Sequence, residues 1–284
     1  MAILLDSNTR VLIQGYGFQG SFHAAKMKAY GTKVVGGITP GKGGTEIDGT
    51  PIFDTVKEAV AGTNATASVI FIPKQAAKAA AFEALDAGIK LLIIITEGIP
   101  KLDTMAVVDR ARKKGVVMIG PNCPGMITPG EAKAGIIPSN IVTKGNIGVV
   151  SRSGTLTYEV IYQLTRSGIG QTSCIGIGGD PVKATNFIEV LRMFQEDKET
   201  KKIVMIGEIG GSSEEDAAAF IKKNVSKPVV GFIAGKTAKE GKQMGHAGAI
   251  IQGNVGTAAG KIQALTNAGV RVANRISEMP TLLK

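Results

Sequence analysis

The sequence of 284 residues has no tryptophan, only four tyrosines and nine phenylalanines, and no apolar run as long as a bilayer span. Few aromatic rings are present to stack on bases and the basic residues are dispersed, which argues against a nucleic-acid partner. The missing apolar run argues against a membrane anchor. Residues 1–10 contain no basic region followed by an apolar stretch, so we expect no signal peptide.

Cysteine and histidine are also scarce, with two of each. Cys123 and Cys174 offer no disulfide framework, and a reducing compartment is therefore the expected location. His23 and His246 are too few to complete a zinc site with these cysteines. We expect no metal ion bound by this chain.

The composition favours a packed protein with a small anionic ligand. Hydrophobic residues make up 44% of the chain, which is enough for a sizeable core. The 38 glycines follow no collagen period, so they indicate tight turns and sites lined by backbone. The 33 basic residues exceed the 23 acidic ones by ten, and this surplus suits an anionic ligand.

Short apolar runs alternate with helical patterns along the chain. Runs that are apolar throughout are typical of strands buried on both faces, so the alternation predicts parallel sheets covered by helices. The expected strands are 10–14, 33–38, 68–72, 90–95, 116–119, 147–150, 172–177, 203–206 and 228–233. The expected helices include 76–87, 104–114, 155–167, 185–196 and 214–224.

Residues 120–146 interrupt this alternation. Four prolines and several glycines gather there, which predicts a linker or a long ordered loop. We therefore expect two α/β domains, residues 1–122 and 147–284, joined by residues 123–146.

A glycine-rich loop follows the first expected strand. Residues 15–20 read Gly-Tyr-Gly-Phe-Gln-Gly, the G-x-G-x-x-G pattern that brings backbone amides to a pyrophosphate at a helix N-terminus. A NAD site needs an acid after the second strand, but Lys42 stands in this region. A lysine suits a phosphorylated ribose, which both NADP and coenzyme A possess, so both ligands stay open.

Two further segments approach a nucleotide-binding P-loop without matching it. Residues 36–42 have the G-x-x-x-x-G-K spacing, but Gly43 replaces the hydroxyl residue that binds magnesium. Residues 231–237 end in Gly-Lys-Thr but are one residue short. Hydrolysis of a nucleoside triphosphate would therefore need another chain.

His246 is the strongest catalytic candidate. It lies in a glycine-rich segment, 241–256, which predicts an exposed loop. A neutral imidazole acts as a nucleophile when a carboxylate fixes its tautomer, and Glu208, at the end of an expected strand, is the best partner. Ser153, Gly154 and Thr155 begin a helix and would bind an anion, such as a phosphate on His246.

Eight stretches, in order over nearly the whole chain, carry a resemblance to a known family. They are YGTK (30–33), TPGKGG (39–44), ITEGIP (95–100), IGPNCPG (119–125), SRSGTLTYE (151–159), GIGGDP (176–181), IGEIGG (206–211) and MGHAGAII (244–251). Taken together, the sequence resembles the alpha subunits of succinate–CoA ligases.

The resemblance implies an N-terminal Rossmann-like CoA-binding domain followed by a flavodoxin-like ligase domain. It implies an αβ or α₂β₂ complex whose beta subunit binds ATP or GTP with Mg²⁺. The implied reaction joins succinate and coenzyme A at the expense of the triphosphate, in the citric acid cycle. The expected location is the cytoplasm of a bacterium or archaeon, or the mitochondrial matrix or another organelle after removal of a transit peptide.

The resemblance also implies roles for single residues. His246 matches the phosphorylated histidine, Glu208 its carboxylate partner, and Ser153, Gly154 and Thr155 the phosphate-binding helix start. The implied substrate contacts are Tyr158, Asn122 and Cys123. The implied CoA contacts are Gly15, Tyr16, Gly17, Phe18, Gln19, Lys42, Ile95, Thr96 and Glu97.

The first glycine loop is one residue shorter than the family's G-x-T-G-x-Q-G, because a threonine is missing after Tyr16.

Two other interpretations compete with the leading one. A related acyl-CoA synthetase would use the same histidine on another acid, such as citrate. An NADP-binding Rossmann module would explain residues 15–20 and Lys42, but would leave His246 and Glu208 without a role.

Overall fold

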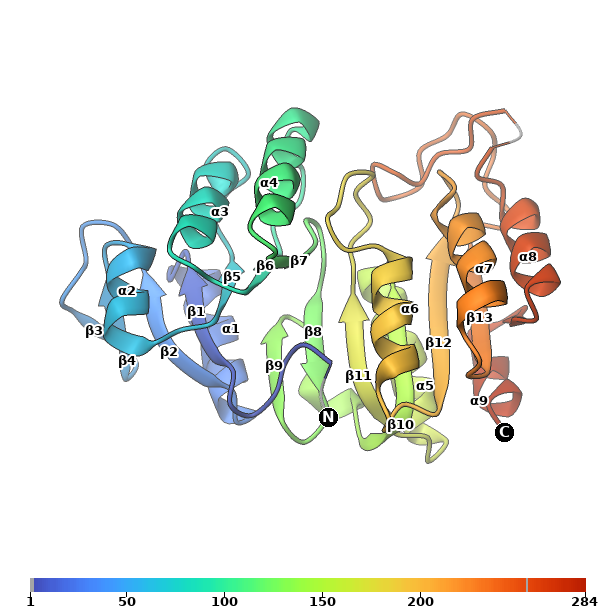
Figure 1. Ribbon diagram of the computed structural model, residues 1–284, viewed down its shortest axis with the longest axis horizontal. Helices are drawn as coiled ribbons and strands as arrows, with labels where there is room; N and C mark the ends of the chain where they lie inside the picture. The colour runs from blue at the N-terminus through green and yellow to red at the C-terminus, as the bar shows by residue number, and fades with distance from the viewer. Residues whose placement is uncertain (1–2, 254) are drawn as a thin grey trace.

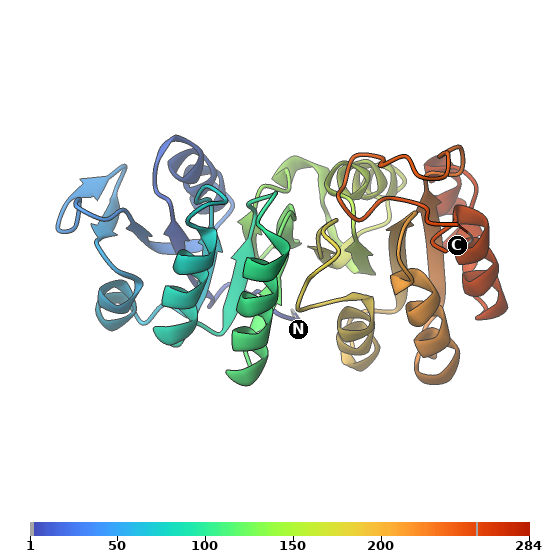
Figure 2. The same cartoon turned by 90° about the horizontal axis from the view of Figure 1, so that it is seen from above.

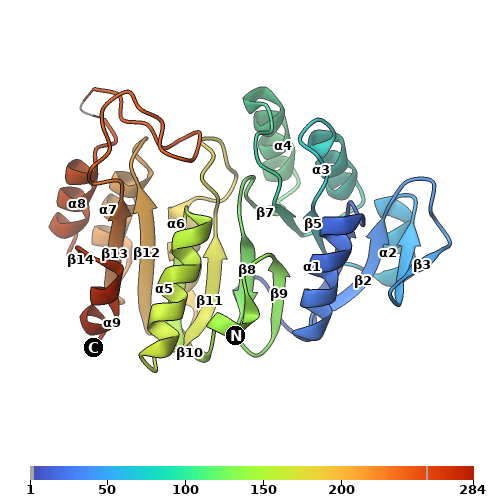
Figure 3. The same ribbon diagram turned by 180° about the vertical axis from the view of Figure 1, so that it is seen from behind.

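Two seven-stranded β-sheets, one from each half of the chain, lie side by side in the part of the protein that the structure describes (Figure 1). The structure is a computed structural model and describes residues 3–253 and 255–284. Helices cover both faces of both sheets, as the views from above and behind show (Figures 2 and 3). The expected α/β fold with mainly parallel sheets is confirmed.

The first sheet has the strand order β3-β4-β2-β1-β5-β6-β7, and only the β3–β4 pair is antiparallel. Without β3, this is the order of a dinucleotide-binding Rossmann fold. The strands are β1 (Arg10–Gln14), β2 (Lys33–Ile38), β3 (Glu46–Ile47), β4 (Thr50–Phe53), β5 (Ala67–Ile70), β6 (Leu91–Ile94) and β7 (Val117–Ile119). The helices are α1 (Phe18–Ala29), α2 (Val56–Thr63), α3 (Ala77–Asp86) and α4 (Lys101–Lys113).

The second sheet has the order β14-β13-β12-β10-β11-β8-β9. Its five parallel strands follow the flavodoxin-like order, with β10 between β11 and β12. The strands are β8 (Gly125–Thr128), β9 (Ala132–Gly135), β10 (Lys144–Ser151), β11 (Gln171–Gly176), β12 (Lys202–Glu208), β13 (Val229–Ala234) and β14 (Arg271–Ala273). The helices are α5 (Gly154–Arg166), α6 (Phe187–Glu196), α7 (Ser213–Asn224), α8 (Ala258–Asn267) and α9 (Met279–Leu282), with 3₁₀ turns at Ser139–Ile141 and Ile276–Glu278.

The prediction of a linker or loop over residues 123–146 was wrong for most of its first half. Strands β8 and β9 form an antiparallel hairpin there, and β8 pairs with β11 of the second sheet. The hairpin also holds the two halves together, because the Thr32 hydroxyl donates to the Lys133 carbonyl at 2.8 Å and Thr128 Oγ1 donates to the Leu5 carbonyl at 2.6 Å. The domain limits at residues 122 and 147 stay a prediction.

The strands are buried because both faces of each sheet are covered. Val11, Leu12 and Ile13 of β1 have no exposed surface, and neither have Val204, Met205 and Ile206 of β12. Both segments are continuous apolar runs, as a strand covered on both faces requires. Among the residues that the structure describes, no helix combines the length and apolarity needed to cross a bilayer.

Candidate functional site

The site around His246 lies at the carboxyl ends of β10 and β12. Ser151 ends β10 and Glu208 ends β12, and these two strands are neighbours in the sheet. The chain leaves β10 toward β11 on one side and later returns to β12 on the other. A crevice forms where the strand order reverses in this way, and open α/β sheets bind their ligands there.

Glu208 holds the ring of His246. Nδ1 of His246 lies 3.0 and 2.9 Å from the two carboxylate oxygens of Glu208. A Cβ at Gly179 would overlap the imidazole, so the ring occupies space that only glycine leaves. The hydrogen bond to Glu208 raises the pKa of His246 above its usual value, although burial opposes the rise. With Nδ1 donating to the carboxylate, Nε2 is the nitrogen available to react.

Beneath this pair lies a buried charge network that the sequence reasoning did not find. Arg152 places Nη2 3.5 Å from Glu208 Oε1 and Nη1 2.9 Å from Glu214 Oε1. Glu214 in turn binds Lys261 at 2.5 Å, and Glu214 and Lys261 have no exposed surface. The network fixes the position of Glu208, because the backbone amide of Glu208 donates to Glu214 at 3.2 Å.

The start of α5 leaves backbone donors free for an anion. Ser153 is the N-cap, and its hydroxyl accepts from the Leu156 amide at 3.4 Å. The Ser153 amide donates to Ser151 Oγ at 3.1 Å. The amides of Gly154 and Thr155 come first in the helix and have no intrahelical acceptor. Arg152, the residue just before Ser153, contacts Glu208 through its guanidinium, so the start of this helix lies close to Glu208.

Residues 120–123 connect the two halves at the site. The Asn122 amide donates to the Thr96 carbonyl at 2.9 Å, and its side chain donates to Asp180 Oδ1 at 3.0 Å. Asn122 adopts a left-handed backbone with φ of 54°. The loop that follows β11 thus lies next to the loop that follows β6.

Two of the expected substrate contacts, Cys123 and Tyr158, are wholly or partly buried in the chain. Cys123 is buried, its Sγ donates to the Ile94 carbonyl at 3.2 Å, and burial raises the pKa of its thiol to about 12. A buried thiol of this kind is unreactive, and a contact of Cys123 with substrate stays a prediction. Tyr158 is half-buried on α5, and burial raises the pKa of its phenol to about 12.

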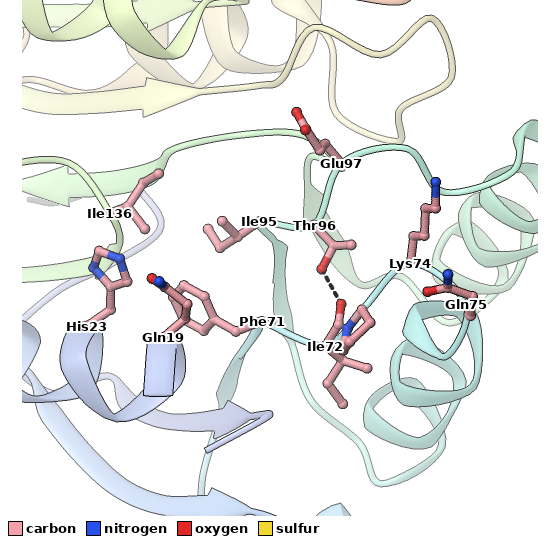
Figure 4. A pocket seen from close by; sticks show the side chains of 11 residues that line it. Gln19, His23, Phe71, Ile72, Lys74, Gln75, Ile95, Thr96, Glu97 and Ile136 are labelled. Carbon is pink, nitrogen blue, oxygen red and sulfur yellow. Dashed lines mark hydrogen bonds between the residues drawn. The ribbon is translucent and has the colours of Figure 1, made fainter. Parts of the chain in front are cut away.

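A cavity of about 470 Å³ lies at the carboxyl ends of β5 and β6 (Figure 4). It is bordered by α1 from one side and by Ile136, just after β9, from another. Its size is within the range of small-molecule sites. The lining residues are Gln19, His23, Phe71, Ile72, Pro73, Lys74, Gln75, Ile95, Thr96, Glu97 and Ile136.

One wall of the cavity is formed by two stacked rings, and the Thr96 side chain in its lining is held by a hydrogen bond. The rings of His23 and Phe71 are stacked, with centroids 5.4 Å apart and planes 4° apart. Burial, with a smaller effect of Lys133, lowers the pKa of His23, so its ring is neutral near pH 7. The hydroxyl of Thr96 donates to the Ile72 carbonyl at 2.6 Å, the dashed bond of Figure 4.

The structure gathers some of the expected CoA contacts and separates others. Gln19, Ile95, Thr96 and Glu97 line the cavity, whereas Gly15, Tyr16, Gly17, Phe18 and Lys42 do not. Phe18 and Lys42 are exposed. Gly15 packs next to Phe71 with φ of 85°, and a side chain at Gly20 would overlap the Gly15 carbonyl, which explains the glycines of this turn.

Tyr16 is not available as a side-chain contact. It is buried, its hydroxyl shares a hydrogen bond of 2.6 Å with Thr50, and its ring fills the space beside Gly37. Its amide donates to the Ile38 carbonyl at 3.4 Å. The side chain of Tyr16 therefore belongs to the core, and the expected contact of Tyr16 with CoA stays a prediction.

Comparison with known proteins assigns both halves. The family model of the CoA binding domain matches residues 6–98, and that of CoA-ligase matches residues 150–271. The chain is 56% identical over 280 residues to succinate–CoA ligase [ADP-forming] subunit alpha 1 of Archaeoglobus fulgidus, covering 98% of this chain and 96% of that protein. It is 57% identical to the corresponding subunit alpha of Aquifex aeolicus, covering 96% and 90%.

A solved structure has the same arrangement of both domains. ATP citrate lyase from Methanothrix soehngenii, in complex with citrate and coenzyme A, superimposes with a TM-score of 0.89 at 26% identity. The match covers 99% of this chain and 50% of that one, so this chain spans half of its length. Identity above 50% over nearly the whole length of the curated relatives shows that the chain belongs to the family of succinate–CoA ligase alpha subunits.

Proposed function

We propose that this chain is the subunit of a succinate–CoA ligase that carries the phosphoryl group, on Nε2 of His246. The observation that supports this most directly is the imidazole, held through Nδ1 by Glu208 at 2.9 Å at the same sheet edge as the start of α5. The overall reaction joins succinate and coenzyme A while a nucleoside triphosphate becomes a diphosphate and phosphate.

The transfer proceeds in three steps, and a different nucleophile attacks in each of them. In the first step, Nε2 attacks the terminal phosphorus of the triphosphate and the diphosphate leaves. A carboxylate oxygen of succinate then attacks the phosphorus, the N–P bond breaks, and succinyl phosphate forms. Finally the CoA sulfur attacks the acyl carbon, the C–O bond to phosphate breaks, and the thiol gives up its proton. Each step is easier than direct attack on a carboxylate.

The phosphoryl group would be stabilised by backbone rather than by a bound cation. The free amides of Gly154 and Thr155 point along the axis of α5, and the positive end of the helix dipole favours a dianion there. Glu208 stabilises the positive charge that the imidazole gains while it is phosphorylated. Arg152 contacts the Glu208 carboxylate through Nη2 at 3.5 Å and compensates its charge in this buried site.

Coenzyme A would occupy the cavity between α1 and the loops after β5 and β6. Gln19, Thr96 and Glu97 offer polar contacts around an apolar floor. Lys42, exposed on the loop after β2, is the cation for the phosphorylated ribose. The loop of residues 120–123 lies between this cavity and the site of His246. The pantetheine arm of CoA would extend past this loop toward His246.

The triphosphate and magnesium would be bound by a beta subunit, in an αβ or α₂β₂ complex. No segment of this chain satisfies the P-loop pattern. In the described ranges, 3–253 and 255–284, no group of three histidine, cysteine or acidic side chains is placed to hold a metal ion. The names of the relatives favour ATP as the triphosphate. The proposed location is the cytoplasm.

The test is reconstitution with the beta subunit of the same organism. We expect formation of a CoA thioester from succinate, CoA and ATP or GTP, measured by absorbance of the thioester bond. Citrate, malate and acetate should be poor substrates. Preference for citrate would instead assign the chain to the citrate-cleaving relatives. Calorimetric titration of the chain with CoA, dephospho-CoA and NADP tests which ligand binds, and Lys42→Ala tests the contact of Lys42 with the phosphorylated ribose. Binding of NADP alone would contradict the CoA assignment.

The pH dependence of phosphorylation follows from the raised pKa of His246. Only the neutral imidazole is a nucleophile, so the rate should rise with pH through a midpoint above 6.5, the usual histidine value. In Glu208→Gln the hydrogen bond to a charged acceptor is lost, and we expect the midpoint to fall and the maximal rate to drop by about 10²-fold. The measurement is the pH–rate profile of His246 phosphorylation in single-turnover experiments. An unchanged midpoint in Glu208→Gln would contradict the assigned contact.

A further inference from the structure

A second cavity, of about 390 Å³, is lined by the His246 loop but not by His246 itself. Ala247, Gly248, Ile250 and Gln252 form one part of its wall. The basic side chains of Lys101, Arg152 and Lys183 also line it, and no acidic side chain is found among the described residues of its lining. A cavity lined by three basic side chains and by no acidic one favours an anion, although Arg152 also contacts Glu208 and Glu214 behind the wall.

Lys183 has no ion-pair partner among the residues that the structure describes. Within the described part of the chain, its ammonium takes part in no hydrogen bond or ion pair. Burial is the main cause that lowers its pKa to about 8, and Arg152 lowers it further, against the attraction of Glu214, Glu208 and Asp180. A half-buried cation that stays unpaired is costly, and a bound anion would remove the cost.

Arg152 and α7 supply the remaining donors. Arg152 is 3% exposed, and its Nε has no hydrogen-bond partner, so Glu208 and Glu214 do not satisfy the whole guanidinium. Ser212, the N-cap of α7, makes no capping hydrogen bond, because its hydroxyl donates to Asp216 at 3.1 Å. Ser212 and Ser213 line the cavity, so the first amides of α7 lie at its wall.

We propose that this cavity is a second anion site, which binds a small oxyanion, either a phosphate group or a carboxylate, between Lys101, Lys183 and Arg152. It differs from the start of α5, because none of Ser153, Gly154 and Thr155 lines it. The proposal does not depend on the proposed reaction. A Cβ at Gly248 would lie 3.3 Å from Arg152 Nη2, so the loop that carries His246 packs close to Arg152 in the wall of this cavity.

Competitive labelling of lysines tests the site directly. The full-length chain, alone and with its partner subunit, is treated with trace acetic anhydride at pH 8, and the labelling of Lys183 is measured by mass spectrometry. A bound anion that raises the pKa of Lys183 by about one unit reduces its unprotonated fraction at pH 8 from about one half to about one tenth. We therefore expect inorganic phosphate or succinate to slow the labelling about fivefold.

Controls separate this site from other effects. Lys223, exposed on α7 and outside the cavity, should be labelled at the same rate with and without the anion. Protection of Lys183 should persist in Ser153→Ala, and Lys183→Met should abolish the protection of Lys101. Protection by phosphate alone identifies a phosphate group as the ligand, and protection by succinate identifies a carboxylate. Equal protection by chloride at the same ionic strength, or no labelling of Lys183 under any condition, would overturn the proposal.

Discussion

Replacing His246 with alanine is expected to reduce turnover of the reconstituted complex by about 10⁴-fold or more, because a covalent step then loses its nucleophile. The ring is 26% exposed and its loop is glycine-rich, so its removal should leave folding intact. The measurement combines the rate of succinyl-CoA formation with the acid-labile phosphate bound to the chain after incubation with the triphosphate. Both should vanish together.

His23→Ala provides the matched control, because His23 is the only other histidine of the sequence. It lines the first cavity and stacks on Phe71, so its loss should weaken CoA binding. It should leave phosphorylation of the chain by the triphosphate unchanged. Phosphate that remains bound to His246→Ala would place the covalent step on another residue and contradict the proposal.

The sequence predicted the contacts that depend on the ends of strands. Glu208 ends an apolar strand, and the glycines around His246 predicted a loop able to reach it; the structure places the two side chains 2.9 Å apart. The strands 10–14 and 33–38 were predicted with the bounds that the structure shows, because short, largely apolar runs between turn signals are typical of buried parallel strands.

What the sequence did not reveal depends on packing between distant segments. Lys261 lies on a short helix where a lysine usually faces solvent, and its burial requires α8 to pack on the start of α7. The strands β8 and β9 are four residues each and flanked by prolines, so their sequence resembles that of a loop. They form a hairpin in the structure because β8 pairs with the edge of β11. The sequence also did not reveal that the Tyr16 side chain is buried, because this depends on the absence of a side chain at Gly37, on the neighbouring strand, where the ring packs.

Replacing Glu214 with glutamine is expected to cause the largest loss of stability among single substitutions at the site. Glu214 accepts from both Arg152 and Lys261, and neither Glu214 nor Lys261 has exposed surface. The substitution keeps the shape but leaves two buried cations without their shared counter-charge. Breaking a buried pair in this way costs about 3–5 kcal/mol. The measurement is urea unfolding followed by circular dichroism.

Glu215→Gln is the matched control, because Glu215 contacts the same ammonium of Lys261 at 2.8 Å but is 31% exposed. Water screens this second pair, so its loss should cost at most about 1 kcal/mol. The two variants share residue type, substitution and the Lys261 partner, so their difference reports the burial of Glu214 together with its additional contact to Arg152. Equal losses in Glu214→Gln and Glu215→Gln would show that the network is worth no more than a surface pair. The loss specific to Glu214 should also lower the rate of His246 phosphorylation, because Arg152 and the backbone of Glu208 are held by the same carboxylate.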